Sequence, residues 1–141
     1  MSVIIKEVSP RYYAGELIRL QYTTLPYDDP LIPTEKGRWW GVFDTGTLVG
    51  YGSMMDARYW REASYLSRAG VLKSHRGQGI HRRLIKIRIR VSQKLKKECI
   101  ISDCTPDNIH SANSLILCGF TLYRPNTPWA LPNSLYWRKK L

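Results

Sequence analysis

Residues 71 to 80 read Val71-Leu72-Lys73-Ser74-His75-Arg76-Gly77-Gln78-Gly79-Ile80 and stand between an apolar segment and an amphipathic one. The segment Tyr65 to Leu72 before them has the composition of a strand, and Gly79 to Lys97 after them repeats apolar residues at helical spacing. Glycine permits a sharp turn, and the first amides of a helix lack internal partners at the positive end of its dipole. The stretch therefore predicts either an anion-binding loop or an ordinary strand-to-helix turn.

The segment Gly79 to Lys97 carries two conflicting patterns. Residues 85 to 91 alternate as a strand would, whereas the full segment has apolar residues at helical spacing. The helical set consists of Ile80, Leu84, Ile87, Val91 and Leu95. We interpret the segment as a helix, because only that pattern spans its whole length. Ile85 and Ile89 are then on the polar side, which leaves room for a contact with a second copy of the chain.

Positive charge is concentrated around this helix. The chain carries a net charge of +11, and the region from Ala63 to Lys97 contains half of the Lys and Arg residues and no Asp or Glu. Such a balance implies an anionic partner. Three classes of partner fit this charge, which are nucleic acid, membrane headgroups and phosphorylated small molecules. From Arg76 to Lys97 there is no aromatic residue to stack on bases, which disfavours nucleic acid.

Length and cysteine content restrict the class of protein further. At 141 residues the chain predicts one domain spanning residues 1–141, and no apolar run approaches the roughly 18 to 20 residues that cross a bilayer. Cys99, Cys104 and Cys118 are odd in number and form no close pair, so they indicate neither a disulfide framework nor a metal site. We therefore expect a cytoplasmic protein without a membrane span or a bound metal.

The remaining elements are expected on both sides of the loop. Apolar runs and turn residues predict strands, helices and one antiparallel hairpin. The order predicts an α+β (mixed α/β) fold in which a mixed central sheet of six to seven strands is flanked by about four helices and contains a parallel strand-helix-strand unit. The expected elements are a strand at Val3 to Val8, a helix at Arg11 to Leu25, a hairpin of Trp39 to Phe43 with Leu48 to Met55, a strand at Ile100 to Thr105, a helix that Pro106 to Asn108 start and cap and that Gly119 stops, and strands at Phe120 to Tyr123 and Leu135 to Arg138.

Two motifs resemble the GNAT superfamily of N-acetyltransferases. The segment Arg76 to His81 is similar to the family signature of Arg or Gln, two residues, Gly, one residue, and Gly or Ala, with His81 at the place of the last small residue. Asn108 followed by Gly119-Phe120 resembles the family's helix after its fifth strand. The resemblance covers about residues 48–123, which it identifies as the cofactor-binding core of a GNAT-like fold.

The resemblance implies that acetyl-CoA is the acyl donor. The backbone of the strand end would pair with the pantetheine arm, and the loop amides would hold the pyrophosphate. Residues Asn108 and Ser111 of the later helix complete the expected contacts. The cofactor-binding residues expected on the strand and loop are Ala69, Gly70, Val71, Lys73, Arg76, Gly77, Gln78, Gly79, Ile80, His81 and Arg82.

The resemblance also suggests residues for catalysis. Several family members use a carboxylate five residues before the conserved Asn, which here is Asp103, and the alternative for Asp103 is a structural cap of the turn at 106–108. The family's tyrosine acid is replaced by Leu115, so Tyr123 is the candidate acid, with Tyr136 and Cys118 as alternatives. A further alternative is that the thiolate leaves without a dedicated acid. His75 is interpreted as a surface or capping residue.

The acceptor site is the least specified part. The negative charges Asp28, Asp29 and Glu35 and an apolar slot formed by Tyr22, Tyr27, Trp39 and Trp40 are one candidate, against the alternative of a solvated loop and core aromatics. The segment 125–137 is a candidate for the opposite side of the pocket. We expect transfer of acetyl to a primary amine of a small molecule or protein. A non-catalytic acyl-CoA-binding module is the alternative, and a nucleic-acid binder is disfavoured.

Overall fold

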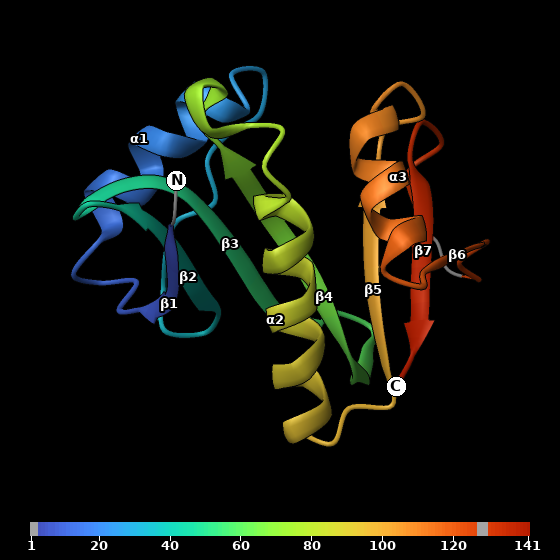
Figure 1. Cartoon of the computed structure of the whole chain (residues 1–141). Coiled ribbons are helices and arrows are strands. Elements are labelled where there is room, and N and C mark those ends of the chain that lie inside the picture. The colour runs from blue at the N-terminus through green and yellow to red at the C-terminus, as the bar shows by residue number, and fades with distance from the viewer. Residues whose placement is uncertain (1–2, 127–129) are drawn as a thin grey trace. The chain divides into compact units, whose positions relative to one another are not determined.

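Hydrogen-bonded strands form a sheet with the order β1-β2-β3-β4-β5-β7-β6. The computed structural model describes residues 3–126 and 130–141. Figure 1 traces the elements in chain order. These are β1 (Ile4–Val8), α1 (Ala14–Thr24), β2 (Arg38–Asp44), β3 (Thr47–Ala57), β4 (Trp60–Val71), the short 3-10 helix η1 (Lys73–His75), α2 (Ile80–Lys94), β5 (Cys99–Cys104), α3 (Ile109–Leu117), β6 (Thr121–Tyr123) and β7 (Leu135–Lys140).

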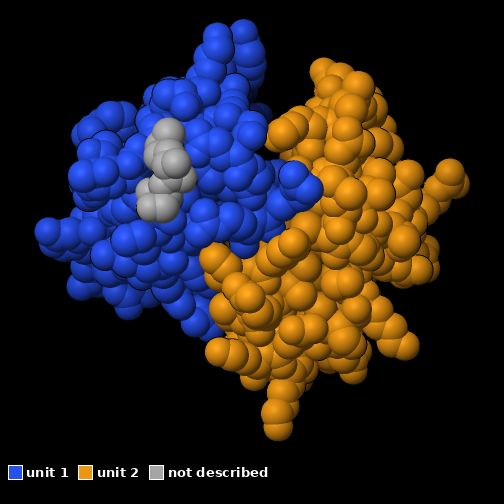
Figure 2. Space-filling view, in the orientation of Figure 1, with its two compact units in different colours: residues 1–55, 67–84 blue, residues 56–66, 85–141 orange. Residues whose placement is uncertain are grey.

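The chain divides into two compact units, which Figure 2 colours separately. The first unit consists of residues 1–55 and 67–84, and the second of residues 56–66 and 85–141. Three elements, β3, β4 and α2, begin in one unit and end in the other. The predicted organisation as a single domain stays a prediction.

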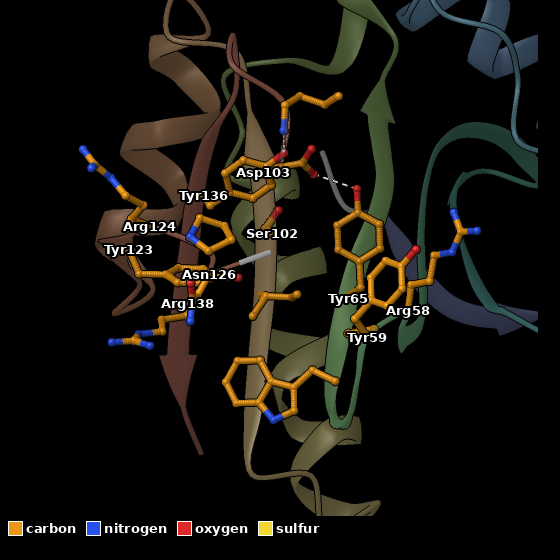
Figure 3. A pocket seen from close by; sticks show the side chains of 15 residues that line it. Arg58, Tyr59, Tyr65, Ser102, Asp103, Tyr123, Arg124, Asn126, Tyr136 and Arg138 are labelled. Carbon is orange, nitrogen blue, oxygen red and sulfur yellow. Dashed lines mark hydrogen bonds between the residues drawn. The ribbon is translucent and has the colours of Figure 1, made fainter. Parts of the chain in front are cut away.

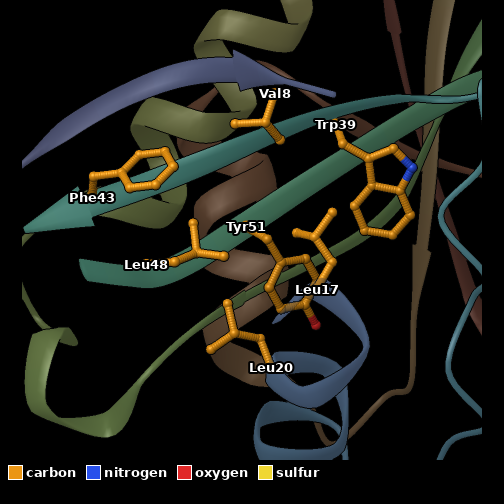
Figure 4. Close-up of a cluster of buried hydrophobic side chains, with 7 residues drawn as sticks. All are labelled: Val8, Leu17, Leu20, Trp39, Phe43, Leu48 and Tyr51. Atoms are coloured by element: carbon orange, nitrogen blue, oxygen red, sulfur yellow. The ribbon is translucent and has the colours of Figure 1, made fainter. Parts of the chain in front are cut away.

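The first unit is built on the antiparallel strands β1, β2 and β3. Their apolar side chains pack with Leu17 and Leu20 of α1. This packing explains why apolar residues recur at helical spacing in the α1 segment. Figure 4 shows this cluster, in which Trp39 lies beside Tyr51 with ring centroids 6.2 Å apart. Trp39 and Trp40 are buried, so these two residues belong to the core and do not line the expected apolar slot.

The second unit contains the predicted parallel pair. Strand β4 pairs with β5 over Ala63–Tyr65 and Cys99–Ile101, and β7 pairs antiparallel with β5 and with β6. Ser92 of α2 donates a hydrogen bond to Ser64 of β4 at 2.9 Å, which places the helix against one face of the strand. Because side chains alternate along a strand, Ala63 and Tyr65 point to the opposite face.

Helix α2 confirms the helical interpretation but not the predicted face. Ile85 and Ile89 are only 1% and 8% exposed, whereas Leu95 is 47% exposed. The buried face of α2 also includes Arg88 and Ser92. The prediction used apolar residues alone and therefore placed these two polar residues on the solvent side. Burial lowers the pKa of Arg88 to about 9. The buried isoleucines therefore provide no surface for the contact with a second copy that they suggested.

Two further predictions need correction. Strand β4 begins at Trp60, five residues before the predicted start. The prediction missed these residues because the β3–β4 turn at residues 58 and 59 has no Gly or Pro to mark it. The described residues form three α-helices and one 3-10 helix, whereas about four helices were expected. None of the described helices is long and apolar enough to span a membrane.

Candidate acetyl-CoA site and acceptor pocket

The predicted anion-binding loop has the backbone that only glycine adopts readily. Gly77 and Gly79 have φ angles of +79° and +76°, in the left-handed region that side chains disfavour. A Cβ at either position would meet nothing within 4 Å, so the backbone conformation and not crowding requires glycine. The amide of Arg83 donates to the Gly79 carbonyl at 3.1 Å, so the open first turn of α2 directly follows the loop.

Two hydrogen bonds hold the loop in place. Arg76 Nε donates to the Val71 carbonyl oxygen at 3.0 Å, which ties the loop to the end of β4. His75 Nε2 lies 2.7 Å from Asp44 Oδ2 in the β2–β3 hairpin, and Ser74 Oγ lies 2.7 Å from His75 Nδ1. His75 thus serves as a structural contact, in agreement with its sequence-based interpretation.

The contact between His75 and Asp44 predicts a pH dependence. The hydrogen bond from His75, with a smaller one from Thr45, holds the pKa of Asp44 below its ordinary value of 3.8. Because the folded pKa is depressed, the stabilisation is complete above the unfolded pKa and is lost as the pH falls through the folded pKa. We expect Asp44→Asn to lower the melting temperature at pH 7, and the difference from the unmodified chain to shrink toward pH 3.

The same substitution should loosen the loop. Acetyl-CoA should bind Asp44→Asn roughly twofold to fivefold more weakly at pH 7, since ordering the loop then costs more. Asp29→Asn, which changes an exposed carboxyl group in the loop before β2, is the matched control and should alter neither quantity. A melting difference that stays constant from pH 7 to pH 3 would contradict this role of Asp44.

The end of β4 is crowded on one side of Gly70. A Cβ there would lie against Thr24 of α1 and 2.9 Å from Tyr51 Cε1. The close approach of α1 therefore requires glycine at this position. Because Gly70 has no side chain, only its backbone can make the predicted cofactor contact. The amide of Leu72, just beyond the strand, donates to the Val49 carbonyl at 2.9 Å.

The predicted cofactor residues of the second unit form a helix cap. Asn108 Oδ1 accepts a hydrogen bond from the Ser111 amide at 3.1 Å, which begins α3. This cap uses the oxygen of the Asn108 carboxamide. The predicted cofactor residues 69–82 belong to the first unit, and Asn108, Ser111, Asp103 and Tyr123 belong to the second.

The two predicted catalytic residues stand in one row across three strands. Asp103 of β5 is opposite Tyr136 of β7, and Tyr136 is opposite Tyr123 of β6. Paired residues point to the same face of a sheet, so all three side chains share the face that α2 leaves free. The Tyr123 and Tyr136 rings meet edge to face at a centroid distance of 6.5 Å.

Asp103 has a partner that the sequence did not reveal. Tyr65 of β4 donates its hydroxyl to Asp103 Oδ1 at 2.6 Å. The two residues are 38 positions apart, and they meet because Tyr65 pairs with Ile101, two residues before Asp103 on the same face of β5. Within the described residues Asp103 thus contacts a phenol and does not cap the turn at 106–108.

Asp103, Tyr65 and Tyr123 line one pocket of about 520 Å³ in the second unit, shown in Figure 3. Predominantly apolar and aromatic side chains form its walls, and Asp103 is the carboxylate among them. The segment 125–137 contributes Pro125, Asn126, Leu131 and Tyr136 to this pocket, and residues 127–129 lie outside the described residues. The residues expected to face this segment do not line the pocket, namely Tyr22, Tyr27, Asp28, Asp29 and Glu35. The other lining residues are Ala57, Arg58, Tyr59, Trp60, Ile101, Ser102, Arg124, Pro125, Asn126, Leu131, Tyr136 and Arg138.

The candidate acids differ in their surroundings. The hydroxyl of Tyr123 is buried with no hydrogen-bond partner among the described residues, and burial raises the pKa of this phenol. The Tyr136 hydroxyl accepts a hydrogen bond from the Leu131 amide at 2.7 Å. Leu115 and Cys118 are buried around α3 and do not line the pocket. Among the alternatives, the tyrosines therefore share a pocket with Asp103 and the cysteine does not.

A comparison with protein families decides the identity of this arrangement. Residues 4–120 match the family model described as the acetyltransferase (GNAT) family. The chain belongs to the GNAT family of acetyltransferases. It is therefore an acyltransferase with acetyl-CoA as its co-substrate, and the resemblance in the two sequence motifs is confirmed.

Solved structures show the same fold at low sequence identity. The Bacillus subtilis acetyltransferase in complex with CoA is 16% identical, covers 99% of each chain and has a TM-score of 0.78. A ribosomal-protein-alanine N-acetyltransferase from Brucella melitensis is 20% identical, with coverage of 98% of this chain and 99% of that chain and a TM-score of 0.76. No curated protein matches the sequence of this acetyltransferase.

The loop of this acetyltransferase fits the phosphates of its co-substrate. Two left-handed glycines with open space beside them bring the backbone to the surface directly before α2. The first turn of the helix presents amides at its positive end, and the exposed residue Arg82 belongs to that turn, whereas Arg83 Nη2 donates to the Val3 carbonyl oxygen at 3.5 Å. The pyrophosphate group therefore has donors and positive charge available within the first unit.

Proposed function

We propose that this acetyltransferase moves the acetyl group of acetyl-CoA to a primary amine by direct transfer, with Asp103 as the base. The observation that carries the proposal is the carboxylate of Asp103 in a largely apolar pocket, held at 2.6 Å by the Tyr65 hydroxyl. A carboxylate positioned by a hydrogen bond can take a proton from an amine bound beside it.

The reaction needs few groups from the protein. The neutral amine nitrogen attacks the thioester carbonyl carbon, a C–N bond forms and the C–S bond breaks. Asp103 takes the proton that the nitrogen loses, and the leaving sulfur gains a proton from a phenol of the pocket, for which Tyr123 and Tyr65 are candidates. The backbone amide of Val71 would polarise the carbonyl oxygen. The products are the acetylated amine and CoA.

The co-substrate would lie along the strand end and the loop. Ala69, Gly70, Val71 and Lys73 would pair with the pantetheine arm through their backbone, as in an added strand. The amides of the loop and first helical turn would hold the pyrophosphate, as supported by the φ angles of Gly77 and Gly79. The residues proposed for this second role are Arg76, Gly77, Gln78, Gly79, Ile80, His81 and Arg82.

A glycine substitution in the loop tests the co-substrate site. We expect Gly79→Ala to weaken acetyl-CoA binding by roughly tenfold in a calorimetric titration, since alanine resists the φ angle of +76° and displaces the loop. Gly46→Ala is the matched control, because Gly46 also has a left-handed φ of +82° and open space but lies in the β2–β3 hairpin.

Both variants should lose a similar amount of stability, about 1 kcal/mol. Only Gly79→Ala should change the affinity for acetyl-CoA. Release of free thiol from acetyl-CoA over a panel of amines then tests transfer itself. Saturable acetyl-CoA binding without acetylation of any amine would favour the non-catalytic acyl-CoA-binding module over the enzyme.

A further inference from the structure

The pocket around Asp103 is unusually rich in aromatic side chains. Of the fifteen described residues that line it, five are Tyr or Trp, about a third, while aromatic residues make up 11% of the whole chain. The five come from three parts of the second unit, the β3–β4 turn, the strand β4 and the paired strands β6 and β7. These residues are Tyr59, Trp60, Tyr65, Tyr123 and Tyr136.

The negative charge of the pocket comes from one carboxylate. Among the described residues that line the pocket, Asp103 is the only acidic one, and its Oδ1 already accepts the Tyr65 hydroxyl. A ligand that enters with one nitrogen can bind to this carboxylate without leaving a second polar group buried and unpaired. The pocket therefore fits an apolar body that carries one amine.

Three arginines at the pocket edge oppose a second positive charge. Arg138 lies over the Tyr123 ring at 4.9 Å and Arg58 lies over the Tyr59 ring at 5.4 Å. Figure 3 shows the Arg58 and Arg124 side chains extending away from the pocket interior. Guanidinium groups in these positions repel an additional ammonium group at the entrance, although they leave the aromatic interior free.

The entrance itself presents apolar surface. Tyr59 and Leu131 both line the pocket and are each 62% exposed. Burying such side chains against an aromatic ring gains hydrophobic and edge-to-face contact, which a small polar amine cannot supply. The volume of about 520 Å³ lies within the range that small-molecule sites occupy.

We propose that this pocket is the acceptor site and that its substrate class is small arylalkyl monoamines, with the ring between the tyrosines and the nitrogen at Asp103. The proposal rests on the proposed amine acetylation, and it adds which amines are accepted. Nitrogen attack, C–N bond formation, C–S bond cleavage and proton transfer to Asp103 follow as described above.

The test compares three amines at equal acetyl-CoA concentration. The kcat/KM for 2-phenylethylamine should exceed that for ethanolamine by at least roughly tenfold, since the ring fills an aromatic pocket. Spermidine should react no better than ethanolamine. Preference for spermidine or ethanolamine, or acetylation of lysine peptides with none of 2-phenylethylamine, would overturn the proposal.

Tyr59→Ala tests the pocket wall without disturbing the core. The variant should raise KM for 2-phenylethylamine by roughly tenfold and leave that for ethanolamine unchanged. Tyr12→Ala, at a tyrosine 80% exposed in the first unit, is the matched control and should change neither value. Equal effects of the two substitutions would remove Tyr59 from the site.

Binding measurements separate this proposal from the proposed function. If acetyl-CoA binds and other amines are acetylated, transfer stands and only the acceptor class fails. If no amine is acetylated, titration of the chain with 2-phenylethylamine alone still reports on the pocket. Saturable binding that Tyr59→Ala weakens would support the acceptor class, and absence of binding would overturn it.

Discussion

We expect Asp103→Asn to lower the turnover number for amine acetylation by about 10²- to 10⁴-fold, the range expected when a general base is removed. Asparagine has nearly the same shape and keeps an oxygen that accepts the Tyr65 hydroxyl, so the pocket should keep its form. The lost property is the ability to take a proton. The measurement is steady-state thiol release at saturating acetyl-CoA, together with calorimetric titration of acetyl-CoA.

The affinity of Asp103→Asn for acetyl-CoA should stay within about twofold of the unmodified value, since the proposed phosphate contacts do not involve this carboxylate. Asp107→Asn is the matched control, because Asp107 is an exposed carboxylate four residues further along the chain. It should retain full turnover. An unchanged turnover number in Asp103→Asn would exclude Asp103 as the base, and would direct attention to the pocket tyrosines.

Gly70→Ala has the largest expected effect on stability. The added Cβ would lie against Thr24 and 2.9 Å from Tyr51 Cε1, and these two side chains already share a hydrogen bond of 2.8 Å between their hydroxyl oxygens. The crowding should lower the free energy of unfolding by about 1 to 3 kcal/mol. Urea denaturation followed by circular dichroism provides the measurement.

Gly15→Ala is the control for the same chemical change in a different setting. Gly15 lies in α1, and a Cβ there would meet nothing within 4 Å. Alanine should therefore raise the free energy of unfolding by about 0.5 to 1 kcal/mol through its better helix propensity. A stability of Gly70→Ala equal to or above that of the unmodified chain would mean that α1 can move away from β4.

Much of the fold could be predicted from local patterns. The β2–β3 hairpin was predictable because two apolar runs flank a short turn. Asn108 caps α3 as expected, and apolar residues at helical spacing predicted α2 over its full length. The face of α2 was predicted wrongly because Arg88 and Ser92 are polar residues on its buried side. Ser92 is satisfied there by Ser64, a contact between elements that no local pattern reveals.

The candidate site was predictable only in part for a similar reason. Asp103 and the glycine loop follow from motifs, each contained in a short stretch of chain. Tyr65 was missed because its contact with Asp103 depends on the parallel register of β4 and β5, which fixes which residues share a face. The aromatic character of the pocket also arises only when β4, β5, β6 and β7 are aligned.

In this pocket, the residues proposed for proton transfer and the residues proposed to select the acceptor lie in different parts of the fold. Asp103 and Tyr65 lie on paired strands inside the sheet, while Tyr59 and Leu131 lie in the connections before β4 and before β7. Connections tolerate replacement far better than sheet interiors do. Evolution or protein engineering could therefore change Tyr59 and Leu131 to accept new amines while Asp103 and Tyr65 stay unchanged.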